Sequence, residues 1–211
     1  MTHSNIAETA PNRPVRGALP RRLASGLLLL GSIVLAPAHA EVAAPGEYRI
    51  DPAHTSVSFR ISHLGVSDLL GRFNELDGRF TLNPKGRSRV EMTIKTASVD
   101  TNHKKRDDHL RSPDFFNARQ YPVMRFVADQ VAFNANGEPT RIDGELSLHG
   151  RTRPVSLAVQ AVGAGKDPWG GYRAGYNAST VIKRSDFGMN FMPGGIGDEV
   201  TLTLAIEGIK Q

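Results

Sequence analysis

The sequence predicts an all-β domain of about eight antiparallel strands with one short helix, and three observations predict it. After residue 48, apolar and polar residues alternate with a period of two along most of the chain, which is the pattern of strands with one buried face. Turn sequences such as NPKGR, NANGEP and LHGRTRP separate the alternating runs, and connections this short join antiparallel neighbours. One charged run, TNHKKRDDHLRSPDFF, interrupts the alternation and has the spacing of a helix.

The first forty residues predict a secretory signal peptide. A pair of arginines precedes the apolar run Leu23–Leu35, and the sequence AHA at residues 38–40 has the small-x-small spacing of a signal peptidase site. The apolar run is too short to span a bilayer, which takes about 20 residues. We therefore expect a periplasmic protein, with a signal peptide at residues 1–40 and a single mature domain at residues 41–211 that can bury a sizeable core.

Composition excludes several classes of protein. Four of the 26 basic residues and one of the 21 acidic residues lie in the predicted signal peptide, which leaves 22 basic against 20 acidic residues in the mature chain. This near balance argues against nucleic-acid binding, which needs a concentrated basic surface. The sequence contains no cysteine, so disulfides and a lipoprotein anchor are excluded and the fold depends on its core.

The strands follow one another along the mature chain, and each is predicted from its alternating apolar positions. Those positions are Val57, Phe59 and Ile61; Phe80 and Leu82; Val90, Met92 and Ile94; Met124, Phe126 and Ala128; Ile142, Leu146 and Leu148; Val155, Leu157, Val159 and Ala161; Tyr172, Tyr176 and Ile182; and Val200, Leu202, Leu204 and Ile206. After the first run, HLGVSDLLGRF predicts a short helical turn in which Ser67 caps Asp68–Leu70. The charged run is expected to form a helix of two turns that ends at Pro113.

This many antiparallel strands must either stack as two sheets or close into a barrel. A barrel of about eight strands has an interior that side chains fill, or that holds one small ligand. The inward positions mix large residues such as Phe59 and Phe126 with small ones such as Gly144 and Ala178. A tunnel and a packed core both fit that mixture, so the alternation alone leaves both open.

The stretch RDDHLRSPDFF, Arg106–Phe116, is the strongest candidate for chemistry. Nucleophilic hydrolysis is not indicated, because cysteine is absent and no serine lies in a nucleophile-elbow context. No glycine-rich phosphate loop opens a helix, and no histidine pair has the HxxxH or HExxH spacing, so neither a cofactor nor a metal is predicted. The simpler interpretation is that these carboxylates and guanidinium groups pair with one another and with loop backbone across one end of the barrel. The arginines would alternatively meet the polar head of a bound molecule.

Four blocks of the sequence carry a resemblance to a known family. They are YRIDPAHTSVSFRISHLGVSDLLGRF, TNHKKRDDHLRSPDFFNARQYPVMRF, GELSLHGRTRPVSL and DPWGGYRAGYNASTVIKRSDFGM. In this order and spacing they resemble the YceI family, also described as polyisoprenoid-binding, lipocalin-like secreted proteins. The resemblance runs from Tyr48 to Ile209, which is nearly the whole mature chain.

The resemblance implies a single antiparallel eight-stranded lipocalin-like barrel with a short helical segment at one end. It also implies an apolar cavity that holds a long-chain amphiphile, such as a polyisoprenoid, an isoprenoid quinone or a fatty-acid amide, and it implies no reaction. We therefore expect a periplasmic carrier or reservoir for such a lipid, and not an enzyme. The alternative is an enzyme acting on a lipid, with Arg106, Asp107 and His109 supplying acid and base.

The candidate site residues follow from the alternation. Twelve side chains are expected to face inward, some lining the cavity and some packing as core: Phe59, Ile61, Phe80, Leu82, Met92, Ile94, Phe126, Leu146, Leu148, Leu157, Tyr176 and Leu204. His54, Arg106, His109 and Arg111 are the candidates for the polar head of the ligand. A homodimer and a transient contact with a membrane or a membrane protein both remain open at this point.

Overall fold

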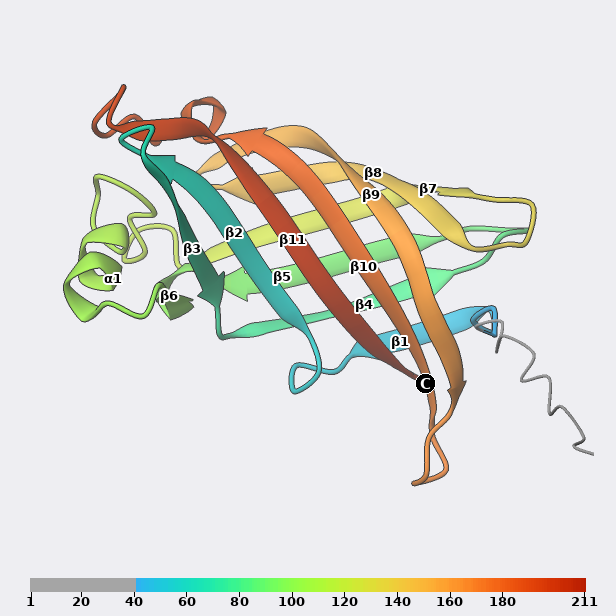
Figure 1. Ribbon diagram of the computed structural model, residues 1–211. Coiled ribbons are helices and arrows are strands. Elements are labelled where there is room, and N and C mark those ends of the chain that lie inside the picture. The colour runs from blue at the N-terminus through green and yellow to red at the C-terminus, as the bar shows by residue number, and fades with distance from the viewer. Residues whose placement is uncertain (1–40) are drawn as a thin grey trace, which may run out of the picture. The chain divides into compact units, whose positions relative to one another are not determined.

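The computed structural model describes residues 41–211, and the predicted signal peptide at residues 1–40 lies outside the described residues. The described chain is mostly strand, with few and short helices (Figure 1). Its strands are β1 Gly46–Ile50, β2 Ser56–His63, β3 Ser67–Phe73, β4 Leu76–Leu82, β5 Arg89–Lys95, β6 Val99–Asp100, β7 Val123–Phe133, β8 Pro139–Leu148, β9 Arg151–Lys166, β10 Tyr172–Lys183 and β11 Ile196–Lys210. The helices are α1 Lys104–Leu110 and two 3₁₀ turns, η1 Thr96–Ser98 and η2 Arg184–Phe187. No helix among the described residues is long and apolar enough to cross a membrane.

Eight strands close into a ring in the order β1, β4, β5, β7, β8, β9, β10 and β11. Each neighbouring pair is antiparallel, and β1 completes the ring by pairing with β4 on one edge and with β11 on the other. Figure 1 shows the strands wrapping around a common interior. The predicted antiparallel eight-stranded barrel with one short helix is confirmed.

One edge of the long strand β11 pairs with two different strands. Its first part pairs with β2, from Ile196 opposite His63 to Ala205 opposite Ser56, and its last residues pair with β1. β2 then pairs with β3, and β3 with β6, so these three strands form a side arm of the ring. Helix α1 lies at the same end of the barrel, on the left in Figure 1. The two ends of the barrel are therefore built differently.

The helical turn predicted at Asp68–Leu70 is wrong, because these residues belong to β3. β3 pairs with β2 along its whole length. Its alternation was concealed in the sequence: Leu70 faces outward with 68% of its surface exposed, and the inward position after Leu69 is a glycine. Gly71 is required there because the ring of Phe59 crosses directly over its backbone.

Strand β1 was also missed, although it closes the barrel. Its five residues, GEYRI, are too few for a period of two to stand out. Tyr48 is fully buried, and its ring stacks on Phe80 of β4 with the centroids 5.0 Å apart. Ile50 is 2% exposed, so both inward side chains of β1 belong to the core. This packing fills the end of the barrel opposite α1.

Gly71→Ala is expected to lower the free energy of unfolding by about 1–3 kcal/mol, because a Cβ at this position would lie 2.3 Å from Cζ of Phe59. Gly175→Ala on β10 is the matched control, since the nearest atom to its Cβ is 3.6 Å away. The control should leave stability unchanged or slightly raised. Urea denaturation of the two variants measures the difference, and equal stabilities would contradict the close approach of Phe59.

Candidate functional site

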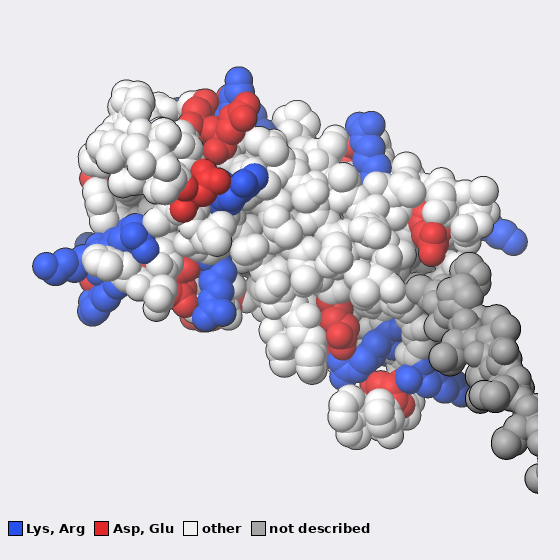
Figure 2. Space-filling view, viewed as in Figure 1, with Lys and Arg blue, Asp and Glu red and all other residues white. Residues whose placement is uncertain are grey.

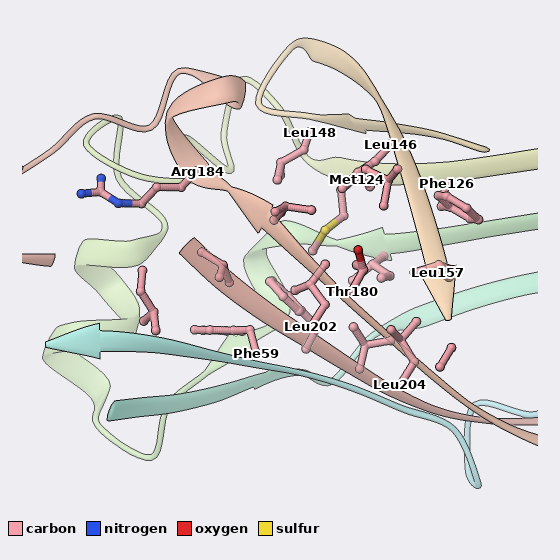
Figure 3. A pocket seen from close by; sticks show the side chains of 18 of the residues that line it. Phe59, Met124, Phe126, Leu146, Leu148, Leu157, Thr180, Arg184, Leu202 and Leu204 are labelled. Atoms are coloured by element: carbon pink, nitrogen blue, oxygen red, sulfur yellow. The ribbon is translucent and has the colours of Figure 1, made fainter. Parts of the chain in front are cut away.

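The barrel encloses a cavity of about 540 Å³, within the usual range for small-molecule sites. Its wall is almost entirely apolar and is built from the inward positions of the strands, as Figure 3 shows for part of it. The structure places on this wall all twelve side chains that the alternation directs inward: Phe59, Ile61, Phe80, Leu82, Met92, Ile94, Phe126, Leu146, Leu148, Leu157, Tyr176 and Leu204. The interior of the barrel is thus a cavity with an apolar surface.

Other parts of the wall come from irregular segments. Leu110, Phe115 and Phe116 reach the cavity from the end of α1 and the segment after it, and Met189 and Phe191 reach it from the loop before β11. A period of two cannot indicate such residues, because their segments are not strands. The pair Phe115–Phe116 after the charged run is the one signal in the sequence for such residues.

The cavity opens at the α1 end of the barrel. Six lining residues are exposed to solvent, and all lie around α1, the β2–β3 turn and the loop before β11: His63, Ser67, Asp68, His109, Phe191 and Met192. At the opposite end, the lining residues Ile50, Phe80 and Tyr176 are buried. A ligand would therefore enter beside α1.

Several large apolar side chains near this opening are exposed to solvent. Leu64, Val66 and Leu70 of the β2–β3 hairpin are 53%, 85% and 68% exposed, and Met192 lies on the neighbouring loop. The amide of Leu64 donates to the carbonyl of Gly195 at 2.7 Å, which ties the two tips together. Figure 2 shows few charged side chains over this tip of the molecule, at its upper left.

The charged run holds α1 against the rest of the chain, largely through backbone groups. Asp107 is buried, and its carboxylate accepts from the amide of Thr101 at 2.9 Å and from the Thr101 hydroxyl at 2.5 Å. Arg111 donates to the carbonyls of Ala97 and Val99 at 2.7 and 2.8 Å. The expected pairing of this run with loop backbone is therefore present.

Of the four head-group candidates, the structure brings two to the cavity. Arg106 and His109 line its open end, whereas Arg111 and His54 are not on its wall. His109 lies between the rings of Phe115 and Phe191, 5.0 and 5.1 Å away, and its Nε2 is 2.8 Å from a carboxylate oxygen of Asp114.

Arg184 is a lining residue that the sequence analysis did not single out. It follows β10 directly, is 5% exposed, and lies at the open end of the cavity (Figure 3). Its Nε, Nη1 and Nη2 donate to the carbonyls of Gly197, Met189 and Ile196 at 2.8, 2.7 and 3.0 Å. Burial lowers the pKa of this guanidinium. Its place at the end of the cavity carried no signal in the sequence, where Arg184 is one more basic residue beside Lys183.

Tyr176 supplies a buried polar group to the wall at the end opposite α1. Within residues 41–211, its hydroxyl is the only buried side-chain oxygen or nitrogen without a hydrogen-bond partner. Burial is the largest cause that raises the pKa of this phenol, so the hydroxyl stays protonated. It lies beside Phe80 at the end opposite α1, with the ring centroids 5.7 Å apart.

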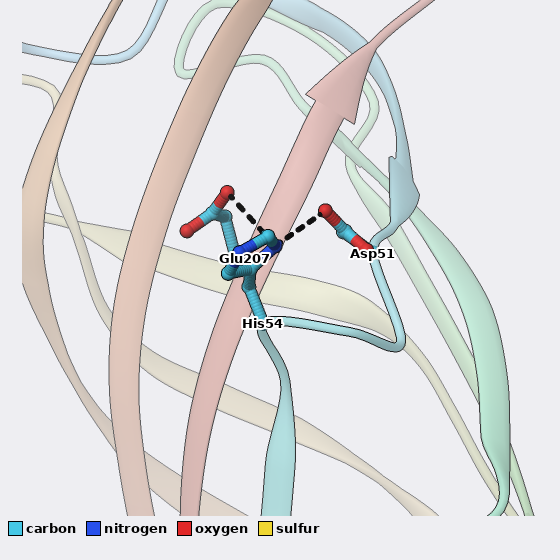
Figure 4. Close-up of side chains that lie close together, drawn as sticks. All are labelled: Asp51, His54 and Glu207. Atoms are coloured by element: carbon cyan, nitrogen blue, oxygen red, sulfur yellow. Dashed lines mark hydrogen bonds and ion pairs between the residues drawn. The ribbon is translucent and has the colours of Figure 1, made fainter. Parts of the chain in front are cut away.

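His54 lies instead in a polar cluster at the closed end, shown in Figure 4. Its Nδ1 is 2.8 Å from Asp51 and 4.0 Å from Glu207, and three such groups could in principle hold a metal ion. However, Arg173 already occupies this cluster, because its Nη1 donates to Asp51 at 2.7 Å and to Glu207. Arg173 also pairs with Asp167 at 2.9 Å. The carboxylates are therefore engaged by a guanidinium, which joins β10, β11 and the chain after β1.

A family model described as a YceI-like domain matches residues 48–208. The chain belongs to the YceI family. A UPF0312 protein of Shewanella denitrificans is 46% identical over 187 residues, which cover 87% of this chain and 96% of the relative. A UPF0312 protein of Pseudomonas aeruginosa is 46% identical over 188 residues, with the same coverage.

Three solved structures share the fold. The YceI protein of Campylobacter jejuni is 28% identical with a TM-score of 0.60, covering 82% of this chain and 99% of its own. BcnA of Burkholderia cenocepacia has a TM-score of 0.65 at 23% identity, covering 75% of this chain and 98% of its own. A polyisoprenoid binding domain from Saccharophagus degradans has a TM-score of 0.59 at 17% identity, covering 78% and 98%.

Asp51→Asn should destabilise this YceI barrel in a pH-dependent way. The hydrogen bond from Arg173, followed by that from His54, lowers the pKa of Asp51 to about 2, against about 3.9 for an unfolded chain. The Asp51 carboxylate therefore stabilises the folded state fully above the pKa that Asp51 has in the unfolded chain, and this stabilisation is lost as the pH falls towards 2. We expect a loss of about 1–2 kcal/mol at pH 7 that shrinks below about pH 4, measured by urea denaturation across that range.

Asp77→Asn is the control for this comparison. Asp77 is 66% exposed and its carboxylate is 4.0 Å from Arg49, so its loss should change stability by less than about 0.5 kcal/mol. A pH-independent difference between the Asp51 variant and the wild type would show that the Arg173 network does not stabilise the barrel through this charge.

Proposed function

We propose that this YceI protein binds a long-chain amphiphile in its barrel cavity and acts in the periplasm as a carrier or reservoir. The ligand would be a polyisoprenoid, an isoprenoid quinone or a fatty-acid amide. The observation that carries the proposal is the apolar cavity of about 540 Å³ with its single group of exposed lining residues at the α1 end. The proposed periplasmic location rests on the signal peptide that the sequence predicts at residues 1–40.

A chain-like ligand suits the energetics of such a wall. Each methylene moved from water into it contributes about 0.8 kcal/mol, so about ten of them supply the free energy of a micromolar complex before ordering costs. Long apolar chains have little solubility in water, and a protein that moves or stores them must enclose them. The solved domain from Saccharophagus degradans, described as polyisoprenoid binding, has the same fold.

The alternative, an enzyme acting on a lipid, has less support. Of its three residues, Asp107 is committed to Thr101 and is not part of the cavity wall. His109 and Arg106 do reach the open end, but His109 is engaged by Asp114. General acid-base chemistry needs a group within hydrogen-bond reach of the reacting atom, and the deeper wall is hydrocarbon apart from the hydroxyls of Tyr176 and Thr180.

The exposed apolar side chains of the β2–β3 hairpin suggest that the ligand is exchanged at the α1 end of the barrel. Leu64, Val66 and Leu70 are exposed near the opening. Exposing apolar side chains costs less free energy at a lipid surface than in water, and exposed apolar patches often mark membrane contacts. We include in the proposal a transient contact of these side chains with a membrane during loading or release.

Ala178→Phe should block the cavity and abolish lipid binding. Ala178 lies on the cavity wall in the middle of β10, so a larger side chain at this position would project into the cavity. The stability of the barrel should therefore stay within about 1 kcal/mol of the wild type. The measurement is native and then denaturing mass spectrometry of protein purified from the periplasm of its own host, with extraction of the bound lipid.

Ala158→Phe is the matched control, because Ala158 lies opposite Ser179 on the neighbouring strand and points outward. The control should carry the same lipid as the wild type. A wild-type protein that contains no lipid and takes up no added long-chain lipid would overturn the proposed function.

A further inference from the structure

One stretch of the ring is not closed by backbone hydrogen bonds. The β9–β10 ladder ends at Ala158 opposite Ser179, although both strands continue towards the α1 end. Beyond this point β9 pairs only with β8, and β10 pairs only with β11. In the same register, residues 180–183 of β10 would lie opposite residues 157–154 of β9, and none of these pairs forms. We call this stretch the β9–β10 window.

A space enters the barrel wall at the β9–β10 window. Outward side chains of both strands border this space, Ser156 and Val181 among them, and so do the inward side chains of Leu157 and Thr180. Side chains from both faces of a sheet border one space only where that space extends between the strands. Leu157 and Thr180 also line the cavity (Figure 3). At the window, therefore, side chains alone separate the cavity from the outer surface.

A separate contact bounds the window at its α1 end. The β8–β9 turn meets the end of η2 there, because Nδ1 of His149 donates to the carbonyl of Phe187 at 2.9 Å. The guanidinium of Arg151 lies directly against Gly188. Phe187 is 1% exposed, so the wall is filled at this contact. The window is thus distinct from the opening beside α1.

The edge of β9 at the window is unsuited to pairing with a strand of another protein. Residues 151–154 are all exposed, and they include two arginines and Pro154, which has no N–H to donate. Charged residues and proline are the features by which sheet edges resist pairing. The same residues disfavour closure of β9 onto β10. The sequence of β9 therefore keeps the gap open.

The unpaired backbone groups along the two edges must meet water, since buried N–H and C=O groups without a partner are costly. Water therefore reaches the wall beside Leu157 and Thr180. Along the rest of β9 and β10 the two strands separate only if ladder hydrogen bonds break. At the window only side-chain contacts oppose their separation, so this part of the wall widens at the lowest cost.

We propose that the β9–β10 window is a second, lateral opening of the cavity, through which the chain of a bound lipid enters and leaves across the wall. It acts in addition to the opening beside α1. The inference rests on the proposed function for its ligand, whereas the opening itself does not. A long chain that leaves through the end of a barrel must slide along its whole length, and a lateral opening shortens that path.

The first test joins the two sides of the window. Ser156→Cys/Val181→Cys places one thiol on each strand, and the chain has no other cysteine. Both positions are exposed and neither lines the cavity. A short, cleavable bis-maleimide links the thiols. The ligand is retinol, a fluorescent isoprenoid alcohol, and stopped-flow fluorescence follows its uptake and its release to phosphatidylcholine vesicles.

We expect the cross-link to slow uptake and release about fivefold or more and to leave the Kd unchanged, because a passage acts equally in both directions. Cleavage of the linker should restore both rates. Gln160→Cys/Asn177→Cys is the matched control. It carries the same linker between the same strands at two exposed residues that the ladder already pairs, so both rates should stay at the wild-type value.

The second test needs no lipid. Thr180→Cys should react with a charged thiol reagent about tenfold or more faster than Leu202→Cys, because reaction follows exposure of the thiol. Leu202 is the matched position, since it lies directly opposite Thr180 on β11 and also lines the cavity. Its strand is paired on both sides at this height, with β10 and with β2.

Two results would overturn the proposal. Equal labelling of Thr180→Cys and Leu202→Cys would show that the window is closed to water. Unchanged retinol kinetics after cross-linking would show that the chain passes only beside α1, and the proposed function would stand. A wild-type protein that takes up neither retinol nor any lipid of its host would remove the proposed function and the passage with it, while the labelling would still decide whether the wall is open.

Discussion

The pairing of β1 with both β4 and β11 is the interaction on which the rest of the structure depends. Without it, β4 and the end of β11 would be open edges, and the inward side chains would collapse together to exclude water. With it, most backbone polar groups of the wall are satisfied around a ring, so the interior can be both apolar and hollow. The stacked rings of Tyr48 and Phe80 fill the end at which this closure occurs.

Within the charged run, some residues hold α1 in place and others lie on the cavity wall. Asp107 and Arg111 hold α1 to the chain that follows β5, and that attachment places Leu110 and Phe115 on the cavity wall. Arg106 belongs to both groups, since its bonds to Thr101 direct it to the opening. A cluster that looks like an active site in the sequence is thus mainly the support for one side of an entrance.

The sequence could predict the barrel and most of its wall, because a period of two directs alternate side chains to one face whatever the neighbouring strands are. It could not reveal β3, where Gly71 and the outward Leu70 conceal the alternation, or β1, which is short. Nor could it tell which loops share an end of the barrel. His54 and Arg106 were for that reason grouped together, although the first lies in the Arg173 network and the second lies at the opening.

One edge of β11 pairs with β2 in its first part and with β1 in its last part, so the two ends of the barrel differ mechanically. At the closed end, separating the wall requires breaking the ring itself. At the other end, the side arm of β2, β3 and β6 meets α1 through side chains and a few loop hydrogen bonds, such as those of Arg111 and Asp107. Local opening there costs far less than global unfolding. We therefore expect a widening of the entrance to leave the register of the ring unchanged, so access to the cavity and thermodynamic stability would depend on different parts of one small fold.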